Sequence, residues 1–153
     1  MIITKKMLDN EYTGSGVLED KEEGKKVVAQ YTKGKHDGIS VTRYSKTKTN
    51  PRNIHIAEEF KDGVKHGLEI KCDKNMPGPH DVELSEYVDG EKTNFGTHSF
   101  DYNDNIFLGH LNEDMSGTGL LLCDDQIYLG ELKDGIPTPD GEWIDAEIWK
   151  YQI

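Results

Sequence analysis

Apolar and polar residues alternate along most of this chain, in short runs separated by turn residues. Leu68 to Cys72 reads apolar, charged, apolar, charged, apolar, and Val82 to Tyr87 begins in the same way. Alternation with a period of two places every second side chain on one face of a β-strand. No segment before residue 140 has a helical period of useful length. The pattern predicts an all-β chain of short strands joined by tight turns.

The stretch from Glu59 to Gly67 shows how these strands are joined. Phe60 ends an apolar run, and Gly63 and Gly67 follow it three and seven residues later. Glycine reaches positive φ without a Cβ clash, so this spacing predicts a hairpin turn. Other copies keep all or part of the spacing: Tyr31/Gly34/Gly38, Tyr87/Gly90, Leu111/Asp114/Gly117 and Leu132/Gly135.

The large residue before each turn recurs at intervals of 29, 27, 24 and 21 residues. Five copies at such intervals indicate a repeat protein built from strand, tight turn, strand and longer turn. Stacked hairpins bring equivalent residues next to one another across the strands. We therefore expect the large residues to form a ladder on one face of the sheet.

The repeat unit resembles the MORN repeat, whose pattern is roughly aromatic-x-Gly-x-aromatic-x-x-Gly. Tyr128-Leu129-Gly130 and Phe107-Leu108-Gly109 match its first half best, whereas Glu58 and Ser85 replace the early glycine in other copies. The resemblance covers about residues 12–143 and implies an elongated single-layer antiparallel sheet of stacked β-hairpins with a concave face. The alternative is an unrelated β-meander whose hairpins use glycine. The structural repeat positions are Tyr31, Gly34, Gly38, Phe60, Gly63, Gly67, Tyr87, Gly90, Phe107, Gly109, Tyr128, Gly130 and Gly135.

We expect one domain over residues 1–153, with distinct segments at its two ends. Residues 1–11 start apolar but include Lys5 and Lys6, which predicts an edge strand protected by lysine. Residues 142–153 fit either one helix face or one strand face, and in both cases are apolar enough to cap an open end. A sheet edge left open at either end could pair with a second copy in a homodimer.

Composition favours a thin core and an acidic surface. Apolar residues make up 34% of the chain and charged residues 31%, and the formal net charge is −11. Residues 1–71 carry 14 Lys/Arg and 11 Asp/Glu, a charge of +3, whereas residues 72–153 carry 4 Lys and 18 Asp/Glu, a charge of −14. This second part repels nucleic acid and anionic lipid and attracts a basic protein. Solubility alone is the alternative explanation.

Carboxylates at the predicted hairpin tips are the candidate partner-binding residues. If the repeats stack, successive turns line up along an edge of the sheet, and an acidic stripe there would speed association with a basic surface. The residues concerned are Asp101, Asp104, Glu113, Asp114, Asp124, Asp125 and Asp134.

Two histidines and one acidic loop are candidates for chemistry, and each has a simpler explanation. His36 and His66 lie inside the turn motif, where their recurrence favours a structural role. The stretch 101–105 imitates the first ligands of a calcium loop, but Ile106 and Asn112 stand where that loop needs Gly and Glu. A hairpin turn made of Asn and Asp explains it better.

No other motif predicts a reaction, a metal or a cofactor. Cys72 and Cys123 have no neighbouring Cys or His, so neither zinc nor a disulfide framework is expected. No nucleophile elbow or phosphate-binding loop is present. The basic cluster Arg43, Lys46, Lys48 and Arg52 fits a solvated loop better than a phosphate site. We expect no enzyme activity, no metal and no cofactor.

The first eight residues lack the apolar run of a signal peptide, and no run approaches the length of a membrane span. We expect a free-standing cytoplasmic protein without an attached catalytic domain. The resulting hypothesis is a non-catalytic protein-binding module, an acidic inhibitor of the immunity-protein or antitoxin type that binds a basic partner such as a nuclease toxin. The alternative is a MORN-type scaffold on membranes or in a cytoskeletal or cell-envelope complex. An enzyme using the concave face is a third possibility.

Overall fold

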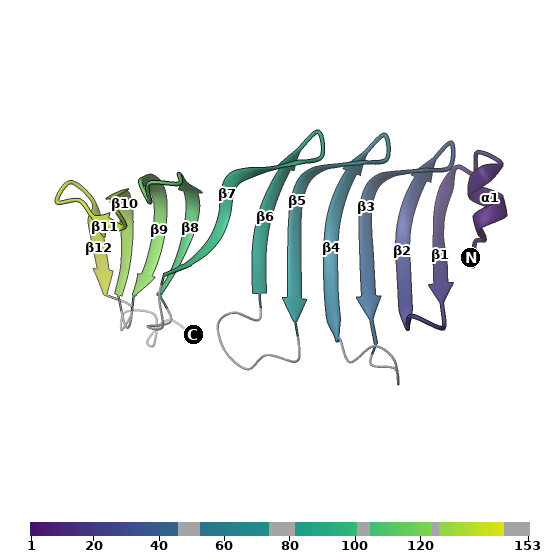
Figure 1. Cartoon of the computed structure of the whole chain (residues 1–153), viewed down its shortest axis with the longest axis horizontal. Helices are drawn as coiled ribbons and strands as arrows, with labels where there is room; N and C mark the ends of the chain where they lie inside the picture. The colour runs from purple at the N-terminus through teal and green to yellow at the C-terminus, as the bar shows by residue number, and fades with distance from the viewer. Residues whose placement is uncertain (46–52, 74–81, 101–104, 124–125, 146–153) are drawn as a thin grey trace. The chain divides into compact units, whose positions relative to one another are not determined.

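The computed structural model describes residues 1–45, 53–73, 82–100, 105–123 and 126–145, and most of them lie in β-strands. The strand order follows the chain order, and consecutive strands pair in the antiparallel sense from β1 to β6 and from β7 to β11, so the predicted all-β antiparallel architecture is confirmed (Figure 1). The elements are α1 (Lys5–Asp9), β1 (Gly14–Asp20), β2 (Lys25–Thr32), β3 (Lys35–Tyr44), β4 (Ile54–Lys61), β5 (Val64–Asp73), β6 (Val82–Val88), β7 (Glu91–Phe100), β8 (Asn105–Leu111), β9 (Gly117–Cys123), β10 (Gln126–Lys133), β11 (Ile136–Pro137) and β12 (Glu142–Asp145).

The chain divides into two compact units, Met1–Lys92 and Thr93–Ile153. The first unit holds α1 and strands β1 to β6, and the second holds β8 to β12 together with most of β7. Each unit has its own cluster of buried apolar side chains. The expectation of a single domain stays a prediction.

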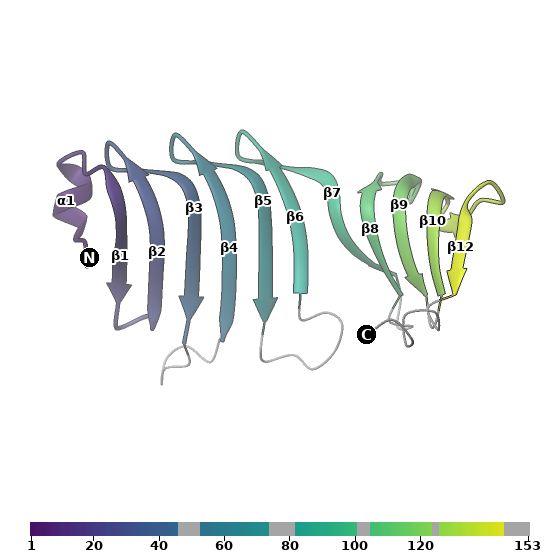
Figure 2. The ribbon, with the colours of Figure 1, turned by 180° about the vertical axis from the view of Figure 1, so that it is seen from behind.

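The amino-terminal segment differs from the predicted edge strand. Only Ile2 pairs with β1, through a parallel bridge to Val17, and the chain then forms helix α1 beside β1 (Figure 1 and Figure 2). Thr4 caps this helix by accepting a hydrogen bond from the Met7 N–H at 3.3 Å. A helix of five residues is too short to give a periodic signal, which is why the sequence did not reveal it.

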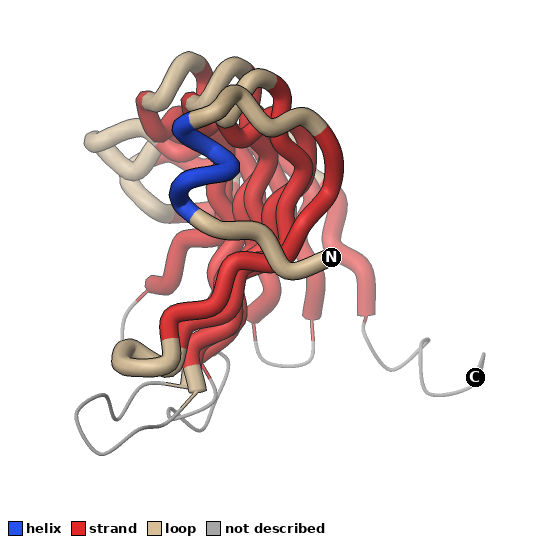
Figure 3. The backbone as a smooth tube through the Cα atoms, turned by 90° about the vertical axis from the view of Figure 1, so that its right-hand side faces the viewer, coloured by secondary structure: helices blue, strands red, loops and turns tan. Residues whose placement is uncertain are grey.

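The first hydrophobic cluster lies beneath this amino-terminal segment. Ile3 is buried against Val27, Ala29 and Tyr31 of β2, with side chains of α1 packed around them. Gly16 of β1 leaves the room for Ile3, because a Cβ there would stand 2.5 Å from the Ile3 Cγ2 atom. Figure 3, seen from the amino-terminal side, shows the helix from its side, in front of the strands. The segment therefore covers one face of β1 and β2 rather than extending the sheet.

The predicted hairpin turns form with two consecutive residues at positive φ, as in type I′ turns. In the second of them, Asp62 has φ 53° and Gly63 has φ 85°. The Gly63 N–H donates to the His36 carbonyl at 2.7 Å, and the Gly90 N–H donates to the Lys65 carbonyl at 2.8 Å. Each hairpin is thus tied to the one before it. Turns of this kind are Lys33-Gly34, Asp62-Gly63, Asp89-Gly90 and Asp134-Gly135.

Two of these turn glycines differ in what surrounds them, which gives a matched pair of substitutions. Alanine at either Gly34 or Gly63 must adopt positive φ, which costs about 1–2 kcal/mol. A Cβ at Gly34 would also stand 2.1 Å from the Leu8 carbonyl oxygen, whereas at Gly63 the nearest atom is a flexible Lys35 carbon at 3.4 Å. We expect Gly34→Ala to cost at least about 1 kcal/mol more than Gly63→Ala in urea denaturation, because a backbone atom must move. Equal losses of stability in the two variants would show that helix α1 moves away from residue 34 without cost.

In the second unit, aromatic rings lie over glycines of the same or neighbouring strands. The Phe107 ring covers Gly109 and Gly119, since a Cβ at either would stand within 3.1 Å of its Cζ atom. The Tyr128 ring covers Gly130 and Gly141 in the same way. Phe107 and Tyr128 are fully buried, together with Leu132. The early glycine of the repeat therefore makes room for the aromatic residue two positions before it.

The last described strand settles part of the ambiguity at the carboxyl end. Glu142–Asp145 forms β12 and pairs with β10, with Trp143 opposite Tyr128. Residues 146–153 of the predicted cap lie outside the described residues. In the described part of the chain, no helix has both the length and the apolar character needed to cross a membrane.

Candidate functional site

One face of the first unit carries a row of alternating aromatic and nitrogen-bearing side chains. The His36 ring lies between Tyr31 and Phe60, with ring centroids 4.7 and 4.9 Å apart and the rings edge to face. Lys65 follows on β5, and its Nζ lies 4.7 Å from the centroid of the Tyr87 ring. Such contacts each add a modest stabilisation. Tyr31, Phe60 and Tyr87 of the predicted ladder therefore share one face, but His36 and Lys65 stand between them.

The two histidines of the turn motif both contact a neighbouring hairpin. Burial, helped by the charge of Lys25, lowers the pKa of His36, so its ring stays neutral at neutral pH. His66 Nδ1 accepts a hydrogen bond from the Asp89 N–H at 3.3 Å. These positions agree with the structural role expected for His36 and His66, because each joins one repeat to the next.

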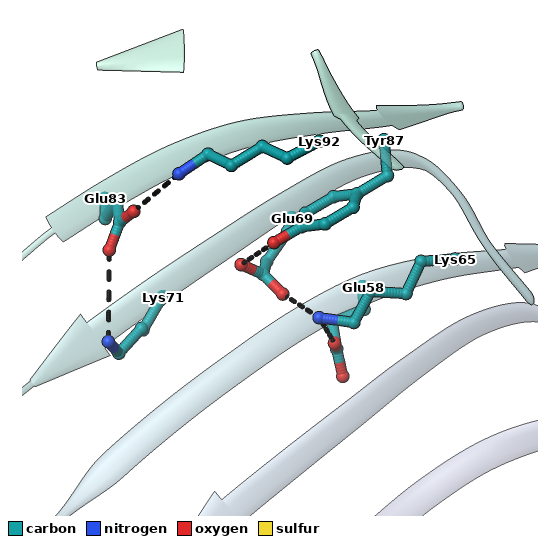
Figure 4. A network of polar contacts seen from close by, with 7 residues as sticks. All are labelled: Glu58, Lys65, Glu69, Lys71, Glu83, Tyr87 and Lys92. Carbon is teal, nitrogen blue, oxygen red and sulfur yellow. Dashed lines mark hydrogen bonds and ion pairs between the residues drawn. The ribbon is translucent and has the colours of Figure 1, made fainter. Parts of the chain in front are cut away.

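Lys65 is the centre of a charged cluster on the same face (Figure 4). Its Nζ lies 2.6 Å from Glu58 Oε1 and pairs with Glu69 as well. The Tyr87 hydroxyl donates to the other Glu69 oxygen at 3.5 Å. Glu58 and Glu69 are directly opposite in the β4–β5 register, so the ammonium of Lys65 separates two carboxylates that would otherwise repel.

The protonation states in this cluster are fixed by the ion pairs. Burial acts to lower the pKa of Lys65, but the hydrogen bonds and charges of Glu58 and Glu69 outweigh it and raise that pKa above its ordinary value. Burial likewise acts to raise the pKa of Glu69, and the bond and charge of Lys65 lower it overall. Lys65 is therefore held as an ammonium ion, which cannot act as a nucleophile or a general base.

A second ion-pair group adjoins the first. Glu83 lies 3.1 Å from the Lys92 Nζ and 3.9 Å from the Lys71 Nζ. The two groups together contain three glutamates and three lysines, so their formal charges cancel. This cluster stabilises the sheet and presents no net charge to a ligand. Sequence reasoning missed it because its pairs are made across strands, and the exact register cannot be read from the chain.

Three of the candidate partner-binding carboxylates are described, and they lie on adjacent turns. Glu113 and Asp114 are exposed in the β8–β9 turn, and Asp134 is exposed in the β10–β11 turn. The Gly135 N–H donates to the Met115 carbonyl at 2.9 Å, which joins the two turns. Hydrogen bonds from the Ser116 hydroxyl and N–H lower the pKa of Asp114, so it stays charged. The geometry brings these three residues to one edge.

The other four candidates, Asp101, Asp104, Asp124 and Asp125, lie outside the described residues. The strand ends next to them, at Asn105, Cys123 and Gln126, are at the opposite end of β8 to β10 from the Glu113 turn. Successive connections in an antiparallel sheet lie alternately at the two ends of the strands. The described candidates thus form an acidic edge made by Glu113, Asp114 and Asp134, and the expected stripe that includes the other four residues stays a prediction.

Net charge follows the division into units. The second unit, residues 93–153, contains 12 Asp/Glu and 2 Lys, a formal charge of −10. The first unit, residues 1–92, contains 17 Asp/Glu and 16 Lys/Arg, a formal charge of −1. The acidic edge belongs to the unit that carries nearly all of the excess negative charge.

Metal and thiol chemistry find little support in the described parts of the chain. Within them, no group of three or more His, Cys, Asp or Glu side chains is placed to hold a metal ion. Cys72 and Cys123 are free thiols and half-buried. Of the predicted basic cluster, only Arg43 is described, and it is exposed at the end of β3.

Comparison with known proteins finds no family model and no curated sequence that matches this chain. The resemblance to MORN repeats stays a prediction.

Proposed function

We propose that this protein is a non-catalytic protein–protein interaction module of the inhibitor type, comparable to an immunity protein or antitoxin, that binds a basic protein such as a nuclease toxin. The observation that carries the proposal is the charge of −10 gathered in the second unit. A concentrated negative field speeds encounter with a basic surface and disfavours acidic partners. We propose the cytoplasm as its site of action, because Cys72 and Cys123 are free thiols, as cysteines usually are in that compartment.

The acidic edge supports this proposal by its exposure and rigidity. Glu113, Asp114 and Asp134 are exposed on turns that hydrogen bonds hold together, so the main chain that carries these carboxylates is ordered before a partner arrives. Preordered charges lose less conformational entropy on binding. The Lys65 cluster, in contrast, is internally neutralised, which favours a structural role over catalysis.

The test is affinity purification of the tagged chain from extracts of its native cell at about 50 mM and about 500 mM salt. We expect one stoichiometric basic protein at low salt and its release at high salt, because exposed charge pairs are screened. Recovery of no stoichiometric protein, or of an acidic one retained at high salt, would contradict the proposal. Flotation with anionic vesicles instead would support the membrane scaffold.

A further inference from the structure

The face of the first unit opposite the aromatic row carries an uninterrupted aliphatic row. Directly paired residues in an antiparallel sheet point to the same side, so the strand registers define this row without gaps. It crosses β1 to β6 through Val17, Val28, Val41, Ala57, Ile70 and Leu84. We call these six residues the aliphatic row.

Three of the six residues of the aliphatic row are exposed. The exposed fractions of Val28, Val41 and Ile70 are 46%, 45% and 48%, and the other three residues are half-buried. Helix α1 packs on the other face, against Val27, Ala29 and Tyr31. Contiguous exposed apolar surface of this kind marks interaction sites.

Charged residues border the aliphatic row on both sides. On the side of the Asp62-Gly63 turn lie Glu59 of β4 and Glu86 of β6, and the Leu68 N–H fixes Glu59 with a hydrogen bond of 2.8 Å. On the other side lie Lys26 of β2 and Arg43 of β3, which are direct cross-strand neighbours. Lys26 pairs with Glu19 at 3.0 Å. The acidic residues thus lie beside β4 and β6 on one side of the row. The basic residues lie beside β2 and β3 on the other side, where Glu19 offsets one of their two charges.

We propose that the aliphatic row docks an amphipathic α-helix of the protein partner, laid across the strands. This inference rests on the proposed function, since it names a second contact surface for the same kind of partner. The partner helix would bear basic residues on the flank over Glu59 and Glu86 and acidic residues on the opposite flank over Lys26 and Arg43. Its apolar stripe would bury the exposed parts of Val28, Val41 and Ile70.

Spacing favours a helix in this position. Neighbouring strands are about 4.8 Å apart and a helix rises about 5.4 Å per turn, so one apolar stripe meets one row residue on nearly every turn. Six strands then accommodate a helix of about 16 residues at 1.5 Å per residue. An apolar stripe one or two residues wide is also the usual form of an amphipathic helix.

A second sheet fits this face less well. Sheets pack with their strands within about 30° of each other, which requires apolar residues at alternate positions along each strand. Only β3, β5 and β6 meet this requirement, through the exposed residues Ile39, Leu68 and Val82 beside the row. On β1, β2 and β4 the neighbours of the row residue on this face are polar or charged, such as His55 and Glu59 on β4. A homodimer through this face is also disfavoured. With the two-fold axis along or across the strands, the acidic border of one copy would not face the basic border of the other. Each copy also carries a charge of −11.

The test uses two synthetic 17-residue fluorescent helices of identical composition. The matched peptide has a leucine stripe, lysines on one flank of its second half and glutamates on the other flank of its first half. In the control peptide the lysines and glutamates exchange flanks but stay in their own halves. Reversing the direction of the control helix on the sheet does not restore the matched arrangement. We expect fluorescence anisotropy to give at least about tenfold tighter binding of the matched peptide. Equal binding, or no binding by either, would overturn the proposal.

Variants of the full chain locate the binding. Ile70→Asp should abolish binding of the matched peptide, and Val41→Thr, which keeps side-chain size and strand propensity, should weaken it about threefold or more. Asp9→Asn, at an exposed position on helix α1, should leave it unchanged. Loss of binding in Asp9→Asn, or none in Val41→Thr with an unaltered circular dichroism spectrum, would place the peptide elsewhere and overturn the proposal.

The proposal and the proposed function fail separately. Recovery of a basic partner from cells without any binding of the matched peptide would overturn the docking proposal alone. Peptide binding without a cellular basic partner would contradict the inhibitor-type function but leave the docking surface intact. A dimer seen in sedimentation that Ile70→Asp dissociates would identify a second copy as the occupant and overturn the helix proposal. Vesicle binding that Val41→Thr removes would identify a membrane as the occupant and overturn it as well.

Discussion

Tyr128→Ala is expected to destabilise the second unit by about 3–5 kcal/mol, the range for removing a buried aromatic side chain. Tyr128 is fully buried in the cluster with Phe107, Leu121 and Leu132. Its hydroxyl donates to the Glu131 or Thr138 carbonyl, at 2.9 and 3.0 Å. The ring also fills the space above two glycines, so its removal leaves a cavity lined by main chain.

The measurement is urea denaturation followed by tryptophan fluorescence, because both tryptophans, Trp143 and Trp149, belong to the second unit. Tyr128→Phe keeps the ring and is expected to cost only about 1–2 kcal/mol, for carbonyls left without their donor. A loss below about 1 kcal/mol for Tyr128→Ala would show that the ring is not a core residue.

Lys65→Met is expected to cost about 2 kcal/mol at pH 7, because it leaves Glu58 and Glu69 facing each other across the β4–β5 register. This loss of stability is smaller than the 3–5 kcal/mol expected for a fully buried pair, because a third of the Lys65 side chain is exposed. Lys71→Met is the control. Lys71 lies on β5 like Lys65, and its substitution removes only the 3.9 Å pair with Glu83 of β6, so it should cost below about 1 kcal/mol.

The pH dependence gives this prediction a definite sign. The folded pKa of Glu69 is lowered, so its contribution is present above its ordinary pKa of about 4.3 and is lost as pH falls through the folded pKa. The raised pKa of Lys65 means that its contribution is lost only as pH rises beyond about 10.4. The stability difference between wild type and Lys65→Met should therefore shrink between about pH 5 and pH 3. A difference that stays constant there would contradict the ion-pair account.

Much of the fold could be predicted from the sequence, because turns and alternation are local signals. Asp62-Gly63 and Asp89-Gly90 carry the preferred chemistry of type I′ turns, and these turns form where predicted. Helix α1 was missed because its five residues depend on the Thr4 cap and on the cluster beneath Ile3, neither of which has a periodic pattern. The coupling of Phe107 to Gly109 was visible as a motif, but its cause, a ring lying over the glycine, required coordinates.

The candidate site was harder to predict, since it depends on register and on sheet edges. The acidic residues were identified individually, but their grouping needs the strand order. Glu113, Asp114 and Asp134 come together because the β8–β9 and β10–β11 turns lie at the same end of their strands. The aliphatic row was not recognised because each strand contributes one residue to it, and cross-strand neighbours lie 11 to 16 residues apart in the chain. Local patterning cannot reveal such a row.

The central claim is that the acidic edge recognises a basic partner, and one comparison tests it most directly. The tagged wild-type chain and the variant Glu113→Gln/Asp114→Asn/Asp134→Asn are used to purify partners from native cell extract, and partner recovery is quantified by mass spectrometry. A control variant, Asp9→Asn/Glu22→Gln/Glu91→Gln, changes the net charge equally within the first unit. We expect the acidic-edge variant to recover at least about tenfold less of one basic protein, and the control nearly as much as wild type. Equal recovery by wild type and the acidic-edge variant, or an equal loss in both variants, would contradict the account.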